Sequence, residues 1–322
     1  MRTKKSYQLS ETDRERLRVA TGREVVDPHA NLFGPESITW RVNREAALLA
    51  GGGCALLLQV AHPLVAAGVM TYSRYRTEPL ERLRNTLELM LTIVFRDAAE
   101  AIAAIREIER RHTRVRGTLD ADIGRYPRGT PYDANDPELM FWVLATLVDT
   151  ALEVYEMLVG PLDAADKLTY YEESKVTARL FGIPDAAIPR TWREFQQYMK
   201  GMINGDALAV GAAGRDIAAS IVDPPLFPGV KQVFQLSNVF TIGLLPPPLR
   251  ERYGYSWSVV HEAALTAAAT FGQLTLPLLP NIIRVMPQAR AAMARHADSQ
   301  ATADQRPARR NAASVRARGS VA

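Results

Sequence analysis

The hydrophobic pattern of this chain is helical almost throughout. From Val42 onward, apolar residues recur at steps of three and four, the spacing that places them on one face of an α-helix. Alternating runs typical of strands are scarce, and no repeat of fixed period occurs. We therefore predict an all-α protein, built as a single large domain of about ten helices. The predicted helices span roughly residues 44–67, 79–95, 98–115, 137–159, 164–181, 191–204, 207–220, 231–245, 256–271 and 282–296.

The same pattern divides the chain into three parts. Residues 1–40 form a polar lead-in with one short helix near residues 11–20, and residues 41–297 form the helical domain. The connections marked by proline and glycine, including the proline run 246–248, are too short to separate two domains. Residues 298–322 are small, polar and without periodicity, so we expect a disordered basic tail.

Composition limits which binding partners and which cellular compartment we expect for this chain. The chain is 47% hydrophobic and carries a formal charge of +4, with much of the excess in the tail, so no nucleic-acid partner is expected. The single cysteine, Cys54, excludes an intrachain disulfide. Because no apolar signal region begins the chain, we expect a cytoplasmic protein.

The apolar stretch 46–70 contains glycines and Pro63, which predicts a core helix broken near Pro63. Peripheral membrane contact and oligomeric state stay open.

The helix predicted at residues 79–95 carries the first candidate site residues. Arg82 and Thr86 lie one turn apart, beside the apolar face and away from the charged side of the helix. A partly buried guanidinium requires an anionic partner. That partner is either a core carboxylate, for which Asp149 and Glu153 are candidates, or the anionic group of a ligand.

Two histidines and the cysteine are the candidate ligands of a cofactor. His112 occupies a core-facing position near the end of the next predicted helix, where it is either a satisfied core histidine or an iron ligand. His62 precedes Pro63 at the expected helix break. Cys54 ranks below His112, because its glycine-rich run offers no nearby cation to favour the thiolate. The chain has no HExxH, CxxC, Walker A or GxSxG motif, which speaks against zinc, nucleotide-loop and serine-hydrolase chemistry.

These residues belong to an ordered series of segments that resembles a family of haem-dependent oxygenases. The family includes the bacterial latex clearing protein, which is a rubber oxygenase, and the farnesyl-cleaving oxygenase of mycophenolic acid biosynthesis. The resemblance covers roughly residues 44–204. Its segments are GGGCALLLQVAHPLVAAGV at 51–69, Arg-x-x-Asn-Thr at 82–86, HTRVRG at 112–117, YDANDPELMFWVLATLV at 132–148 and YYEESKVTARLFGIP at 170–184.

The resemblance implies an all-α fold that holds a b-type haem. In that case His112 is the ligand of the iron, Arg82 and Thr86 belong to the haem environment with His62 as a further contact, and the haem propionates are the anionic partners of the arginine. Two residues depart from the family pattern: Asn85 stands where rubber oxygenases carry a lysine, and Leu144 where many relatives carry a histidine. Residues 46–77 also contain no acid that could serve as a distal base.

The resulting prediction is a haem b-dependent oxygenase, an oxidoreductase that combines molecular oxygen with a small hydrophobic substrate of an isoprenoid or lipid-like kind. Arg82 and Thr86 are its predicted catalytic residues. The departures favour an alternative, a non-catalytic haem carrier or sensor on the same fold. A structural helical protein without a cofactor is the third interpretation.

Overall fold

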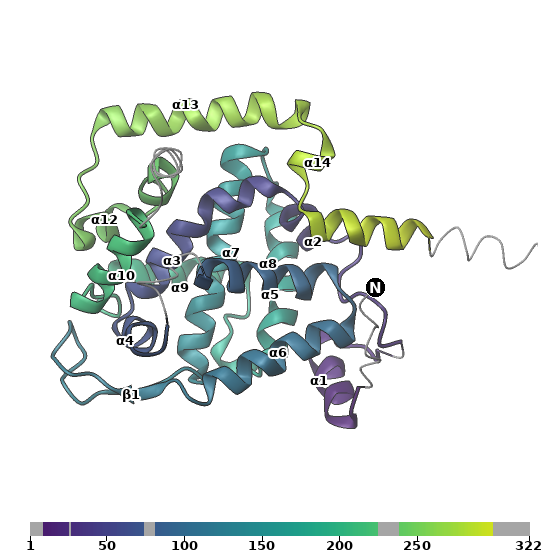
Figure 1. The fold of residues 1–322 in the computed structure, drawn as a ribbon, viewed down its shortest axis with the longest axis horizontal. Coiled ribbons are helices and arrows are strands. Elements are labelled where there is room, and N and C mark those ends of the chain that lie inside the picture. The colour runs from purple at the N-terminus through teal and green to yellow at the C-terminus, as the bar shows by residue number, and fades with distance from the viewer. Residues whose placement is uncertain (1–8, 26, 74–80, 225–237, 299–322) are drawn as a thin grey trace, which may run out of the picture.

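The computed structural model describes residues 9–25, 27–73, 81–224 and 238–298, apart from the side chains of residues 81–83. The predicted all-α fold is confirmed (Figure 1). Residues 238–243 and 287–298 are also helical. The other helices are α1 Glu11–Thr21, α2 Ile38–Asn43, η1 Ala46–Gly51, α3 Gly52–Val60, α4 Pro63–Tyr72, α5 Glu81–Phe95, α6 Ala98–His112, α7 Pro137–Leu158, α8 Ala164–Leu180, η2 Asp185–Ala187, α9 Trp192–Asn204, α10 Ala212–Val222, α12 Pro247–Tyr253, α13 Val259–Thr275, η3 Leu276–Leu278 and α14 Asn281–Arg284.

Two hydrophobic clusters form the core. The first is built on α3, α4, α7, α8, α9 and α10, around side chains such as Trp142 and Tyr171. The second is built on α1, α5, α6 and helical residues 287–298, around Trp40 and Phe95. In Figure 1, α7 and α8 lie at the centre of the molecule and the other helices surround them. The 22-residue α7 is therefore buried along much of its length, which explains its nearly continuous apolar sequence.

Local capping fixes where the helices of the site begin. The Asp136 carboxylate accepts hydrogen bonds from the backbone N–H groups of Glu138 (2.8 Å) and Leu139 (3.3 Å), and Pro137 occupies the first turn of α7. Asp97 caps α6 in the same way, by accepting from the backbone N–H of Glu100 at 2.8 Å. These caps satisfy backbone donors that the first helical turn leaves free.

The apolar stretch 46–70 forms a bent pair of helical segments. Ala46–Val60 and Pro63–Tyr72 meet at an angle of 106°, which confirms the expected break at Pro63. By length and composition this bent pair could cross a membrane, whereas no single helix among the described residues is long and apolar enough to do so. Most of the side chains of α3 are buried inside the protein.

The chain differs from the predicted elements in three places. The strands β1 Arg116–Thr118 and β2 Pro131–Asp133 form an antiparallel pair that is too short to show an alternating pattern. The proline run 246–248, expected as a connection, instead begins α12, since proline fits the first turn of a helix. The helix expected at 282–296 is split: α14 ends at Arg284, and helical residues resume at 287.

Candidate functional site

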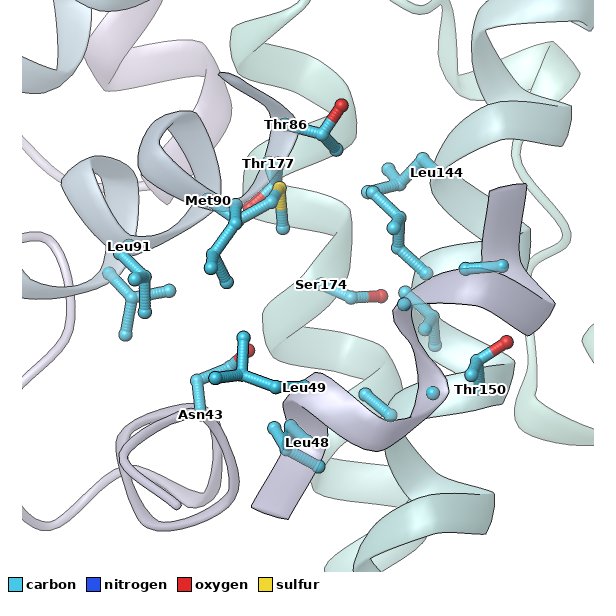
Figure 2. A pocket seen from close by; sticks show the side chains of 18 of the residues that line it. Asn43, Leu48, Leu49, Thr86, Met90, Leu91, Leu144, Thr150, Ser174 and Thr177 are labelled. Carbon is cyan, nitrogen blue, oxygen red and sulfur yellow. The ribbon is translucent and has the colours of Figure 1, made fainter. Parts of the chain in front are cut away.

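A cavity of about 110 Å³ lies where the two hydrophobic clusters meet (Figure 2). Thr86 and Met90 of α5 line one part of it, and Leu144 and Thr150 of α7 line another. None of the described residues that line the cavity is charged. The full lining consists of Thr39, Asn43, Leu48, Leu49, Gly51, Gly52, Ala55, Leu56, Gln59, Thr86, Leu87, Met90, Leu91, Val94, Leu144, Leu147, Val148, Thr150, Ala151, Tyr170, Ser174, Thr177 and Met286.

The glycine-rich run explains how the cavity wall is built. A Cβ atom on Gly51 would lie 2.6 Å from the Cγ2 atoms of Thr150 and Val154, so only glycine lets η1 approach α7 this closely. Gly51 and Gly52 also face the cavity.

A few polar groups interrupt the apolar wall. The Asn43 side-chain amide donates to the Thr39 carbonyl at 2.9 Å and to the Tyr170 hydroxyl at 3.2 Å. The Gln59 amide donates to the Thr146 hydroxyl at 3.3 Å. The buried Thr39 hydroxyl has no hydrogen-bond partner among the described residues. A buried hydroxyl without a partner is costly, so a ligand atom that hydrogen-bonds to Thr39 would be favoured.

Of the predicted site residues, Thr86 is the one that lines this cavity. It is half-buried on α5, on the side away from the exposed Arg84 and Glu88, as its predicted helical position requires. The backbone of Arg82 lies one turn earlier in the same helix. Its side chain lies outside the described residues, so its orientation and its partner stay predictions.

His112 is the last residue of α6 and is half-buried rather than fully enclosed. Burial is complete at Ala101, Ile102 and Ile105 and falls toward this end of the helix. The chain that follows packs against α4: a Cβ on Gly68 would lie 3.1 Å from Val115 Cγ1. His112 does not line the cavity. Because a two-residue turn makes α5 and α6 antiparallel neighbours, the end of α6 returns toward the start of α5, where Arg82 and Thr86 are placed.

The ring of His62 forms hydrogen bonds within the protein through both of its nitrogen atoms. Its Nδ1 accepts a hydrogen bond from the backbone N–H of Leu64 at 3.3 Å and caps α4, while Nε2 lies 3.1 Å from the Tyr126 hydroxyl. Burial, with the nearby charge of Arg125, lowers the His62 pKa to about 4, so the ring is neutral at physiological pH. Both ring nitrogens have protein partners and His62 does not line the cavity. Its predicted cofactor contact stays a prediction.

Cys54 is an unreactive thiol, and a further histidine, His261, already has a hydrogen bond and a ring contact within the protein. Burial raises the pKa of the Cys54 thiol well above its ordinary value, which disfavours the thiolate that binds iron. His261 accepts from the backbone N–H of Ser258 at 3.1 Å through Nδ1 and stacks on Trp257. The described residues contain no group of three or more histidine, cysteine, aspartate or glutamate side chains that could hold a metal ion.

The predicted acid pair on α7 lies outside the cavity lining. Asp149 is half-buried, and burial raises its pKa to about 6. The charges of Asp149 and Glu153 contribute to the raised pKa of Cys54, which places both acids near α3. Their pairing with Arg82 stays a prediction.

Comparison with known proteins identifies the family. Residues 40–274 match the family described as ER-bound oxygenase mpaB/B'/Rubber oxygenase, catalytic domain. The chain belongs to this family. Two relatives, the uncharacterized proteins Rv2237 of Mycobacterium tuberculosis and Mb2261 of Mycobacterium bovis, are each 23% identical over 232 residues, which is 70% of this chain and 88% of each relative. No solved structure matches the chain. The resemblance drawn from the sequence segments is confirmed, and the family supports an oxidoreductase of the oxygenase type.

The structure adds site residues that the sequence did not single out. Four family segments meet at the cavity: the first contributes Gln59, the second Thr86, the fourth Leu144 and the fifth Ser174. Thr39 and Ser174 were not singled out because they lie on α2 and α8, outside the helices that carry Arg82 and His112. Ser174 stands within the family segment 170–184, whereas Thr39 lies before the first segment.

Proposed function

We propose that this protein is a haem b-dependent oxygenase whose largely apolar cavity holds an apolar part of the substrate. The observation that carries the proposal is the convergence of four family segments, at Gln59, Thr86, Leu144 and Ser174, on one apolar cavity. A cavity of this kind gains binding free energy from apolar contact and offers only a few hydroxyl and amide groups to orient a ligand.

The available donor set fits haem better than a free metal ion. Zinc in proteins takes three or four protein ligands, whereas haem brings four nitrogen ligands of its own and needs one axial side chain. The described residues offer no cluster of three ligands, and His112 is the histidine for which the family resemblance gives an iron-binding role. Haem, when bound, supplies the iron that activates molecular oxygen.

The volume of the cavity suits a small apolar group. An apolar cavity of about 150 Å³ accepts one benzene molecule, and this cavity measures about 110 Å³. The cavity thus has room for a small apolar part of a ligand. In our proposal this part belongs to the substrate, and His112 would hold the cofactor.

The roles of the protein residues follow from their chemistry. The His112 imidazole binds as a neutral nitrogen donor. Thr86 presents a hydroxyl that can donate a hydrogen bond at the cavity wall. Arg82 would pair with a carboxylate of the cofactor, because a guanidinium can donate two parallel hydrogen bonds to a carboxylate. The leucine and methionine side chains exclude water, which strengthens each of these polar contacts.

Absorption spectroscopy of protein purified from haem-supplemented cells tests the cofactor. We expect about one haem per chain, with a Soret band that His112→Gly diminishes and that added imidazole restores. Glycine is tolerated at the end of a helix, so this variant retains the fold. The exposed His29 provides the control, because His29→Ala should leave the spectrum unchanged. A wild-type protein that fails to take up added hemin would refute the proposal.

Thr86→Val tests the cavity wall, because valine keeps the shape of threonine and removes only the hydroxyl. We expect haem content near that of wild type and turnover lowered by roughly a hundredfold, as for other lost hydrogen-bond donors at reacting centres. Thr92→Val is the matched control, since Thr92 lies on the same helix but does not line the cavity. Full turnover in Thr86→Val would limit this residue to packing.

The alternative function is a haem carrier or sensor. It is favoured by one observation: no described residue of the cavity wall is an acid, a base or a histidine that could move a proton. Oxygen uptake separates the two functions. An oxygenase consumes oxygen when an apolar substrate is added, whereas a carrier or sensor binds haem and shows no substrate-dependent uptake.

A further inference from the structure

The outer face of α13 is an apolar surface with no covering element among the described residues. Val259, Val260, Phe271 and Leu274 are exposed on this helix, and Leu278, Ile282 and Ile283 continue the surface beyond it. We call these seven residues the outer stripe. They account for seven of the twelve exposed large hydrophobic residues in the described part of the chain, within only 25 positions. Clustering of this kind marks an interaction site, whereas scattered exposed residues do not.

α13 differs from an ordinary surface helix because it keeps large apolar side chains on the side that faces away from the protein. At 100° per residue, Val260, Ala267 and Leu274 share one side and Leu265 and Gly272 share the other. Leu265 is buried, and a Cβ on Gly272 would lie 2.9 Å from Leu158, so the second side faces the body. A surface helix normally turns its apolar side inward. α13 is apolar on both sides, and the side that carries Val260 and Leu274 points away from the protein.

α13 is held in this orientation by contacts at both ends. At its start, Trp257 donates to Glu262 at 2.7 Å and stacks under the Arg250 guanidinium, 4.9 Å from the ring centre. At its end, the Gln273 amide donates to the carbonyls of Glu156 and Met157 at 3.3 and 3.1 Å. Figure 1 shows α13 running along one edge of the molecule. The outer stripe is therefore presented by an anchored helix.

The segment after α13 is fixed as firmly. Arg284 donates to the buried Glu45 carboxylate, with Nε 2.8 Å from Oε2, and the backbone N–H of Met286 donates to the Arg44 carbonyl at 2.8 Å. These bonds tie the end of the stripe to the start of η1. Ile282 and Ile283 thus keep their place beside α13 and extend a single surface.

We propose that the outer stripe is the contact between two copies of this chain. Each of its seven side chains can bury on the order of 100 Å², so the stripe offers about 700 Å² per copy. Specific interfaces bury about 800 Å² per partner. Two copies related by a twofold axis bring the same stripe together from both sides. Apolar groups then meet apolar groups, and the absence of charged residues on the stripe avoids any repulsion between like charges.

The charge pattern favours a second copy over a lipid surface. Helices that lie in a membrane interface carry lysine or arginine on their polar face. Residues 259–283 contain none, and Glu262 is their single acidic residue. A second copy needs no such basic residues, because alanines between the large residues let two helices approach closely.

Analytical ultracentrifugation of the full-length protein tests this interface. We expect a dimer that dissociates on dilution, and Leu274→Glu should weaken it by at least about a hundredfold, because dimerisation would bury an unpaired charge. Val19→Glu is the control: Val19 is also an exposed apolar residue on a helix, but it lies on α1, at the opposite edge of the molecule from α13 (Figure 1). Circular dichroism should be the same for both variants and wild type.

A second measurement separates the other occupants. The flotation assay uses vesicles of phosphatidylcholine with phosphatidylglycerol. A monomeric wild type that floats with these vesicles, and loses this binding in Leu274→Glu, would show that a membrane covers the stripe and would overturn the dimer. A wild type that stays monomeric at all concentrations would also overturn it, as would a dimer that Leu274→Glu leaves intact.

Discussion

The cavity and the outer stripe are both apolar and carry no charged side chain among the described residues, yet they lie in opposite settings. The cavity is enclosed between the two hydrophobic clusters and contains hydroxyl and amide groups such as those of Thr39 and Asn43. The stripe on α13 is exposed and faces away from the body. The cavity can select a ligand by shape and a few hydrogen bonds, whereas the stripe can recognise another apolar surface of matching area. Whether an apolar surface lies in a cavity or on the outside of the protein therefore indicates what it binds better than its composition does.

The largest expected effect concerns the tie that holds the far end of the stripe. Arg284→Ala leaves the buried Glu45 carboxylate with Arg44 alone, at Nε–Oε1 3.2 Å, and should lower the free energy of unfolding by about 2 to 4 kcal/mol. Arg284→Lys keeps the charge and should cost less. Denaturant unfolding provides the measurement. A loss below about 0.5 kcal/mol, the usual range of a surface substitution, would mean that the end of the stripe is not anchored through Glu45.

The next effect concerns the cavity wall. Leu144→Ala should lower the free energy of unfolding by about 2 to 3 kcal/mol, since Leu144 is buried, although an existing cavity beside it reduces its contacts. The same variant should accept a bulkier substrate once one is identified. Thermal unfolding and competition between substrates of different width provide the measurements. Unchanged stability would indicate that the wall around Leu144 collapses to fill the space.

A pH-dependent effect is expected at Asp149 on α7, the helix that touches both regions. Its folded pKa of about 6 lies above its ordinary value of 3.8, so the unfolded chain loses this proton first as pH rises. Ionisation therefore destabilises the protein progressively between about pH 4 and 6, by roughly 1 to 3 kcal/mol at pH 7. Asp149→Asn should be more stable than wild type above pH 6 and equal to it below pH 4. Glu36→Gln, at an exposed site, is the control.

The smallest effect should come from the stripe itself. Leu274→Ala should change the free energy of unfolding of the monomer by less than about 0.5 kcal/mol, because the side chain is 68% exposed in a single chain. Unfolding of dilute protein provides the measurement, with Leu144→Ala as the reference. A cost similar to that of Leu144→Ala would show that Leu274 is covered within the monomer, and the two apolar surfaces would no longer differ in kind.

Much of the fold was predictable because helix formation depends on local spacing. The break at Pro63 and the helices α5 to α9 follow from residue types that are neighbours in the chain. The split at Val285 was not predictable, since it depends on Val285 bridging to Glu45, which is 240 positions away. The helical start at Pro247 was missed because proline fits both a connection and a first helical turn.

The sequence by itself determined the helical class, the family and the identity of His112, Arg82 and Thr86 as candidates, because each rests on periodicity or on ordered segments. Only the tertiary structure decided which polar residues share the cavity with Thr86, since Thr39 and Ser174 come from helices distant in the chain. It also decided that both nitrogens of His62 are engaged. The orientation of α13 was also settled only by the tertiary structure. A nearly all-apolar helix shows no preferred face in its sequence, so its contacts with the body select which side stays exposed.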